Sequence, residues 1–180
     1  MSIEAILREV LAAEGGFVDH KDDRGGATNW GITEAVARSW GWSGAMRDLP
    51  RDVALEIYRK RYVIDPGFDK VALLSAHIAA ELVDTGVNMG PVVAGRFLQR
   101  ALNALNRQGA DWADVAVDGA IGARSLAGLA ALLRRRGAEG ERVVLLALNA
   151  LQGARYIELA EGRAANESFL FGWIGKRVAM

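Results

Sequence analysis

The sequence predicts a mainly α-helical protein with one small β-hairpin. Apolar residues recur at helical spacing along most of the chain, which is the pattern of amphipathic helices. Residues 16–31 differ, because glycine, aspartate, threonine and asparagine gather there and predict turns or a short hairpin. The chain has 180 residues, of which 51% are hydrophobic, so it can bury a core without the disulfides that its lack of cysteine excludes.

The first half is expected to hold three helices around the hairpin. An apolar stripe over residues 3–11 predicts a helix that Ser2 caps and that Gly15 and Gly16 end. Thr33 can cap a short helix that runs to about residue 39. Pro50 opens a helix that ends near Tyr62. Three apolar residues would anchor the hairpin segment: Phe17, Val18 and Trp30.

The second half is expected to be more uniformly helical. Apolar stripes predict helices over residues 71–82, 97–105, 126–133, 138–160 and 169–178. Tight turns are expected at residues 84–91 and 117–122. The first of these turns divides the chain into two predicted lobes, residues 1–90 and 91–180. Because this turn is too short for a flexible linker, the lobes are expected to pack against each other.

Composition argues against several classes of function. The 22 basic and 22 acidic residues balance, so the electrostatic attraction that drives non-specific nucleic-acid binding is missing. The lack of cysteine excludes an Fe–S cluster and a thiolate zinc site, two histidines argue against a histidine-rich metal site, and no metal or cofactor is implied. Apolar runs fall short of the roughly 20 residues that span a bilayer, and charged residues interrupt the first 14 positions. We therefore expect neither a signal peptide nor stable membrane insertion.

Glu14 is the most unusual residue in the first predicted helix. It follows Leu7, Val10 and Leu11 at helical spacing, which places a carboxyl group at the end of the apolar stripe. Partial burial and the negative end of the helix dipole would both favour the protonated carboxyl, which can donate a proton. The alternative from the same spacing is that Glu14 simply ends the helix in solvent.

The next segment supplies groups that could work with Glu14. Asp22, Asp23 and Thr28 lie on a glycine-rich loop that can fold back over it. A proton-donating acid that faces a second carboxylate is the arrangement that glycoside hydrolysis requires. An ordinary Asp-rich turn is the alternative. A calcium loop is disfavoured because the EF-hand ligand spacing is missing, and a phosphate loop because no Gly-Lys-Ser/Thr follows.

The residues around Glu14 resemble a known family. EGGFV at residues 14–18 and DRGGATNWGIT at residues 23–33 are similar to the signature of glycoside hydrolase family 108, the phage-type N-acetylmuramidases. The resemblance implies a lysozyme-like helical fold of two packed lobes, with Glu14 as the catalytic acid. Asp23 and Thr28 resemble the acid and hydroxyl that follow the glutamate in phage lysozymes. Arg24 stands where the family usually has proline.

The resemblance extends over nearly the whole chain. DTGVNMG at residues 84–90 is similar to the family's Asp-x-x-x-Asn-x-Gly turn. LQRALN at 98–103, VDGAIG at 117–122 and FGW at 171–173 resemble the predicted peptidoglycan-binding region that accompanies these enzymes. IYRKRY at 57–62 resembles a family helix that ends in Tyr-Trp, with Val63 in place of the tryptophan.

Three residues are candidates for contact with the sugar. Trp30 and Tyr62 flank the polar loop and could stack on sugar rings, although packing in the core is the alternative for each. Asn88 lies in the glycine-rich turn, where it either contacts substrate or caps a helix.

The resemblance implies a muramidase that cleaves the β-1,4 bond between N-acetylmuramic acid and N-acetylglucosamine in the glycan strands of peptidoglycan. Synthesis in the cytoplasm, release through a holin-like pore or a secretion apparatus, and action on the periplasmic cell wall are then expected. Two alternatives stay open. One is a lytic transglycosylase, which needs an acid but no water-activating carboxylate. The other is a non-catalytic module that binds the wall or assists export.

Overall fold

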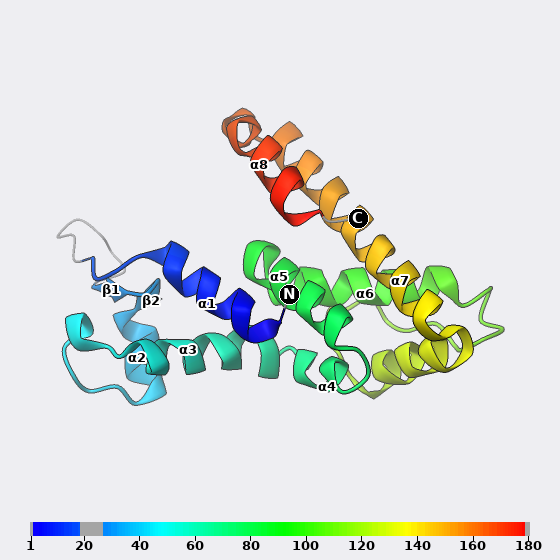
Figure 1. The fold of residues 1–180 in the computed structure, drawn as a ribbon, viewed down its shortest axis with the longest axis horizontal. Coiled ribbons are helices and arrows are strands. Elements are labelled where there is room, and N and C mark those ends of the chain that lie inside the picture. The colour runs from blue at the N-terminus through cyan, green and yellow to red at the C-terminus, as the bar shows by residue number, and fades with distance from the viewer. Residues whose placement is uncertain (1, 19–26, 179–180) are drawn as a thin grey trace. The chain divides into compact units, whose positions relative to one another are not determined.

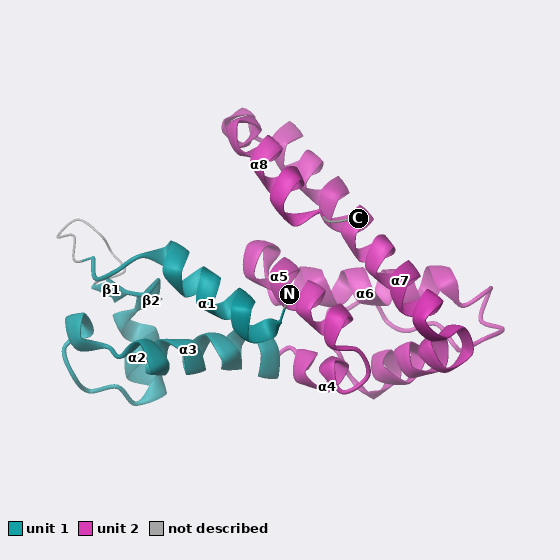
Figure 2. Ribbon diagram, viewed as in Figure 1, with its two compact units in different colours: residues 1–65 teal, residues 66–180 magenta. Residues whose placement is uncertain are grey.

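The computed structural model describes residues 2–18 and 27–178, and the chain forms two compact units, residues 1–65 and 66–180 (Figure 2). The described part is mainly helical with one two-stranded antiparallel sheet, which confirms the predicted fold class. Both loop carboxylates, Asp22 and Asp23, lie outside the described residues.

Unit 1 contains the predicted helices and hairpin (Figure 1). Its elements are α1 (Ile3–Glu14), β1 (Thr28–Asn29), β2 (Ile32–Thr33), α2 (Glu34–Trp40), a 3-10 turn (Met46–Asp48), α3 (Arg51–Arg59) and a π-helical turn (Lys60–Ile64). Both predicted caps are confirmed. The Ser2 hydroxyl accepts from the Ala5 backbone N–H at 3.2 Å, and the Thr33 hydroxyl accepts from Val36 at 3.4 Å.

The core of unit 1 lies between α1 and α3, which pack on each other. Leu7 and Leu11 of α1 are fully buried, as is Ala54 of α3. An exposed ion pair joins the same two helices, since Arg59 contacts Glu4 at 2.8 Å. The apolar stripe of the first helix therefore finds its partner within unit 1.

Unit 2 is built from helices that pack around α5, α6 and α7. Its elements are α4 (Phe68–Ala72), α5 (Ala76–Met89), α6 (Pro91–Leu105), α7 (Ala123–Glu161), a 3-10 turn (Ala164–Asn166) and α8 (Glu167–Arg177). Leucine and isoleucine side chains from the predicted stripes form the core, among them Ile78, Leu82, Leu98, Leu102, Leu129 and Leu148.

Two local predictions for this unit are wrong. The expected turn at residues 84–91 is mostly helix, because α5 continues to Met89 and only Gly90, with φ of 93°, interrupts the chain before α6. Burial of Leu82 and Val83 against neighbouring helices outweighs the local turn propensity. The stripe over residues 71–82 is also divided, because Ser75 caps a new helix by accepting from Ile78.

The packing units and the predicted lobes divide the chain differently. Along the chain, the boundary between the units falls between Asp65 and Pro66. Helix α5, which the predicted lobes assign to the first half, packs against α4, α6 and α7 in unit 2. The lobes of residues 1–90 and 91–180 stay a prediction.

Helix α7 bends at Gly137, whose φ of 57° and ψ of −142° are not helical. The sequence predicted two separate helices on either side of this point. Among the described residues, α7 is the one helix whose length and composition would also suit a membrane span. This is weak evidence, because core helices of soluble proteins share these properties, and Leu129, Val144 and Leu148 of α7 are buried in unit 2.

The segment between α6 and α7 is held by one buried glutamine. Gln99 donates to the Asp118 carboxylate at 2.8 Å and to the Ala120 carbonyl at 3.0 Å, and it accepts from the Gly119 backbone N–H at 2.7 Å. A methyl group at Gly95 would lie 2.1 Å from the Gly119 carbonyl oxygen, so only glycine permits this approach. Two of the sequence motifs, at residues 98–103 and 117–122, therefore meet in space.

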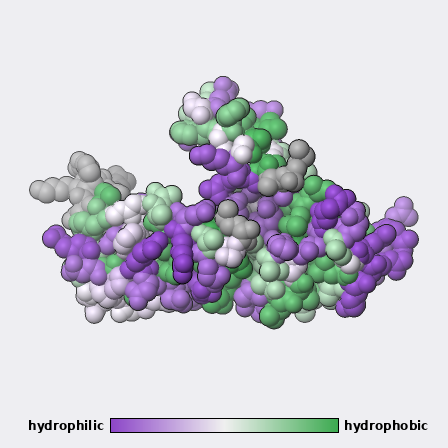
Figure 3. All heavy atoms as spheres, viewed as in Figure 1, coloured by the Kyte–Doolittle hydropathy of each residue, from purple (hydrophilic) through white to green (hydrophobic). Residues whose placement is uncertain are grey.

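Helix α8 combines exposed apolar side chains with a polar attachment. Phe169 and Phe171 are exposed, and Figure 3 shows hydrophobic residues among the polar ones on this helix. Arg177, at the end of α8, contacts the Asp84 carboxylate of α5 at 2.5 Å. Trp173 stacks on Tyr156 of α7, with ring centroids 5.3 Å apart. Trp173 is half-buried through this contact.

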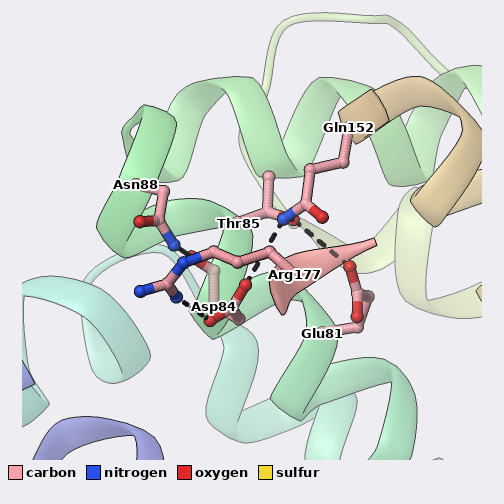
Figure 4. A network of polar contacts seen from close by, with 6 residues as sticks. All are labelled: Glu81, Asp84, Thr85, Asn88, Gln152 and Arg177. Atoms are coloured by element: carbon pink, nitrogen blue, oxygen red, sulfur yellow. Dashed lines mark hydrogen bonds and ion pairs between the residues drawn. The ribbon is translucent and has the colours of Figure 1, made fainter. Parts of the chain in front are cut away.

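The ion pair of Arg177 belongs to a network that links α5, α7 and α8 (Figure 4). The amide nitrogen of Gln152 donates to the Thr85 hydroxyl at 3.0 Å and to Asp84 at 3.3 Å. Glu81 lies one turn before Thr85, whose hydroxyl is 3.5 Å from the Glu81 carboxylate. Burial, followed by the neighbouring charge of Asp84, raises the pKa of Glu81 to about 7.

This raised pKa predicts that unit 2 loses stability as the pH rises. Below about pH 4.5 Glu81 is protonated in the folded and unfolded chains alike. As the pH rises to about 7, the unfolded chain ionises first, and folding loses up to about 3 kcal/mol. Denaturant unfolding measured by circular dichroism between pH 5 and 8 should show this decline, and Glu81→Gln should remove it.

Glu139→Gln is the matched control, because Glu139 is an exposed carboxylate of the same unit that pairs with Arg142. The control should retain the decline of the wild-type chain. Equal pH dependence of the wild type and Glu81→Gln would contradict the assignment to Glu81.

Candidate active site

The hairpin turn places an unusual backbone beside the end of α1. Asn29 pairs with Ile32, which leaves Trp30 and Gly31 as a two-residue loop, with φ of 54° and 70°. Two consecutive positive φ angles suit tight hairpins, but they are uncommon for a bulky residue such as tryptophan. The indole N–H of Trp30 donates to the Leu49 carbonyl at 3.0 Å, and this contact helps to hold the strained residue.

A second anchor comes from the residue before the loop. The side-chain amide of Asn29 is buried and donates to the Met46 carbonyl at 2.8 Å. The hairpin is thus tied at two points to the segment that precedes α3. Sequence reasoning did not identify this role of Asn29.

Glu14 lies directly against this turn. A methyl group built on Gly31 would lie 2.7 Å from a Glu14 carboxylate oxygen and 2.8 Å from the Tyr58 hydroxyl. Both oxygens therefore occupy the space that a side chain at position 31 would need. The absence of that side chain lets α1, the hairpin and α3 bring these groups together.

Glu14 itself is exposed to solvent. The partial burial predicted from the apolar stripe is therefore wrong, and the alternative, a helix that ends in solvent, is what the structure has. The physical reason is that α1 ends at Glu14 and is followed by Gly15 and Gly16, which carry no side chains to cover it. The carboxyl group is accordingly open to a large ligand.

Tyr58 connects the parts of this site. Its hydroxyl donates to the Trp30 carbonyl at 3.2 Å, and its ring lies 5.6 Å from that of Tyr62. Burial, and then the nearby charge of Glu14, raises the pKa of Tyr58 to about 12. The phenol therefore stays protonated near neutral pH and acts as a hydrogen-bond donor. Sequence reasoning treated Tyr58 as a helix residue, although its spacing of four from Tyr62 indicated an aromatic pair.

A small cavity opens beside the same turn. Its volume is about 40 Å³, and its lining includes Gly31, Thr33, Tyr58 and Arg61. Ligand pockets usually reach about 300 Å³ or more, whereas a single water needs only about 10–15 Å³. The cavity can therefore hold water beside Gly31 and Tyr58, but it is too small for a larger ligand.

The structure brings together some of the predicted residues. Glu14, Trp30 and Tyr62 gather around Tyr58 in unit 1. Thr28 lies on β1, opposite Thr33 on one side and bridged to Val18 on the other. Asp23 lies outside the described residues.

Asn88 belongs to unit 2, near the end of α5. Its side-chain amide donates to the Asp84 carbonyl at 2.7 Å, one helical turn earlier. This contact gives Asn88 a structural role within the helix. Its side chain is nevertheless exposed.

Acidic residues and histidine are the described side chains that could bind a metal ion. Within residues 2–18 and 27–178, no group of three or more such side chains is placed to hold a metal ion.

Comparisons with known proteins assign both halves of the chain. Residues 7–90 match the model of the glycosyl hydrolase 108 family, and residues 93–178 match the predicted peptidoglycan domain. The structure of SagA from Brucella abortus is similar, with a TM-score of 0.60 and 29% sequence identity over 97% of this chain and 87% of that one. No curated protein matches the sequence.

The first match spans α1, the hairpin, α3 and α5, and it therefore includes Glu14 and the residues around it. The second spans α6 to α8. The N-terminal half of the chain belongs to the glycosyl hydrolase 108 family, and the C-terminal half is a predicted peptidoglycan domain.

Proposed function

We propose that the protein is an N-acetylmuramidase that cleaves the β-1,4 bond between N-acetylmuramic acid and N-acetylglucosamine in peptidoglycan. The family supports a glycoside hydrolase, and the C-terminal domain supports peptidoglycan as its substrate. The observation that carries the proposal is the position of Glu14. Its carboxyl group is exposed at the end of α1 beside the Trp30–Gly31 turn, and no atom lies within 4 Å of the positions that methyl groups on the following Gly15 and Gly16 would take.

In the proposed reaction Glu14 donates its proton to the glycosidic oxygen as the bond to the sugar breaks. The ring carbon becomes cationic, water adds to it, and the proton that this water releases replaces the one that Glu14 donated. Asp23 orders this water or stabilises the cationic sugar, and Thr28 helps to position the water. No metal or cofactor takes part.

Tyr58 has a positioning role in this scheme. Its hydroxyl bonds to the Trp30 carbonyl and lies against Gly31 together with the Glu14 carboxylate. It therefore restricts where the acid can move. Trp30, Tyr62 and Asn88 are proposed to contact the glycan.

The C-terminal domain would hold the wall polymer while unit 1 cuts it. The substrate lies outside the cytoplasm, so the protein would reach the periplasm through a holin-like pore or a secretion apparatus.

Replacement of the acid tests the centre of the proposal. Glu14→Gln keeps the shape of the side chain but removes the transferable proton, so hydrolysis of purified cell walls should fall by about 10²–10⁴-fold. Turbidity assays measure this rate, and circular dichroism checks that the variant is folded. Near wild-type clearing by the variant would exclude Glu14 as the acid.

The products identify the reaction. Hydrolysis leaves a reducing end on N-acetylmuramic acid, and mass spectrometry of the fragments detects it. Anhydro-muramic ends would instead mean a lytic transglycosylase.

The two loop carboxylates can be separated by substitution. Asp23→Asn should lower kcat more than it weakens glycan binding, because the carboxylate is assigned to the transition state. Asp22→Asn is the matched control and should have a milder effect on kcat. A larger effect at Asp22 would move the second carboxylate by one residue.

The glycine of the turn gives a sharp structural test. Gly31→Ala would push on the Glu14 carboxylate and on the Tyr58 hydroxyl, so wall hydrolysis should fall at least about tenfold. Positive φ adds strain of about 1–2 kcal/mol to the folded state.

Gly41→Ala is the control for that strain. Gly41 has φ of 100° in the same unit, but no atom lies within 4 Å of the position that its methyl group would take. This variant should lose stability and keep activity. Equal activity losses in the two variants would show that strain, rather than displacement of Glu14, is responsible.

A further inference from the structure

Unit 2 contains a cavity that the proposed cleavage does not use. It lies between α6 and α7, has a volume of about 280 Å³, and is completed by Val117 of the loop between them. Its lining combines apolar side chains with three arginines and one glutamate. The charged residues are Arg96, Arg100, Arg155 and Glu158.

Two of these arginines stand on one face of α6. Arg96 and Arg100 are four residues apart, so they are neighbours on the helix surface, and both are exposed. Across the part of the chain that the structure describes, neither has an acidic partner within ion-pair distance. Like charges at this spacing repel each other, and a bound anion would remove that repulsion.

The other two charged residues of the lining, Arg155 and Glu158, already form an ion pair with each other. Arg155 donates to Glu158 at 2.9 Å on α7, which fixes the direction of its guanidinium group. The Asp118 carboxylate accepts hydrogen bonds from Gln99 and from the Ala120 backbone N–H, and these bonds, with a smaller contribution from the charge of Arg96, lower its pKa. The residues that line the cavity, three arginines and one glutamate, therefore carry an excess of positive charge.

The floor of the cavity is apolar. Phe97 is almost fully buried beneath it, and Val93, Val117 and Leu151 form its walls. An exposed aromatic ring, on which a sugar would stack, is missing from this lining. Planar guanidinium groups instead match carboxylates through paired hydrogen bonds. The chemistry fits a ligand with carboxylates and small apolar groups.

We infer that this cavity binds the stem peptide of peptidoglycan, with Arg96 and Arg100 pairing its carboxylates and the apolar floor receiving its alanine methyl groups. The inference rests on the proposed function, in that the polymer is peptidoglycan. Each muramic acid of that polymer carries a short alanine-containing peptide with free carboxylates. Recognition of the peptide would hold the strand independently of the sugars that unit 1 contacts.

Binding is tested on the full chain carrying Glu14→Gln, so that the ligand is not cut. Isothermal titration compares three probes: a disaccharide tetrapeptide, the same disaccharide without peptide, and the free tetrapeptide. Both peptide probes should bind the Arg96→Ala/Arg100→Ala variant at least about tenfold more weakly, because charge-assisted hydrogen bonds are lost. The Arg96→Lys/Arg100→Lys variant should retain part of the affinity, because lysine keeps the positive charge but lacks the paired N–H donors of the guanidinium group.

Arg124→Ala is the matched control, since Arg124 is an exposed arginine of α7 outside the cavity lining. It should bind the peptide probes like the parent chain. Equal binding of the peptide probes by the parent chain and the double alanine variant would overturn the inference. So would arginine-dependent binding of the peptide-free disaccharide, or displacement of the tetrapeptide by inorganic phosphate at similar concentration, which would mark a general anion site.

Wall hydrolysis by the chain with Glu14 intact separates the two proposals. Hydrolysis without arginine-dependent peptide binding overturns the inference alone. Arginine-dependent peptide binding without hydrolysis supports the inference and overturns the proposed activity. If neither hydrolysis nor arginine-dependent peptide binding is observed, both proposals are overturned.

Discussion

The left-handed backbone at Trp30 and Gly31 is the constraint on which the candidate active site depends. It lets the hairpin turn within two residues, and it leaves the space at Gly31 that the Glu14 and Tyr58 oxygens occupy. Tryptophan does not favour this conformation, so contacts from elsewhere have to hold it. The indole bond to Leu49 and the Tyr58 bond to the Trp30 carbonyl supply them. Strain of this kind persists where surrounding structure over-determines it, and such places are often functional sites.

Unit 2 uses a different kind of constraint. Its helices bury apolar stripes, but buried polar side chains decide how the connecting segments lie. Gln99 fixes the loop before α7 through four partners, and Gln152 links α5 to α7 beneath the Arg177 ion pair. The energy of each hydrogen bond depends on the direction from donor to acceptor, whereas the hydrophobic burial of leucine has no preferred direction. The apolar core provides most of the stability, and the polar contacts specify the arrangement.

These two constraints correspond to different tasks. Under the proposed function, unit 1 has to keep the Glu14 carboxyl group exposed beside the turn, where Gly31 leaves space for it and Gly15 and Gly16 carry no side chains to cover it. In unit 2 a groove with arginines has to stay open, and the pinned loop next to α6 forms one of its walls. The two proposals thus assign cleavage of the polymer to unit 1 and its retention to unit 2.

The sequence by itself determined the helical class, the hairpin, the Ser2 and Thr33 caps, the position of Glu14 at a helix end and the family. These features depend on residues within a few positions of one another, where spacing and capping chemistry are sufficient. Only the tertiary structure decided that α5 continues through residues 84–89, that Glu14 is exposed, and that Tyr58 and Gly31 adjoin it. Tyr58 is distant from Glu14 in the chain, and α5 is extended by burial against helices that follow it. Such contacts outweigh local turn propensity, and no local pattern encodes which distant residues will meet.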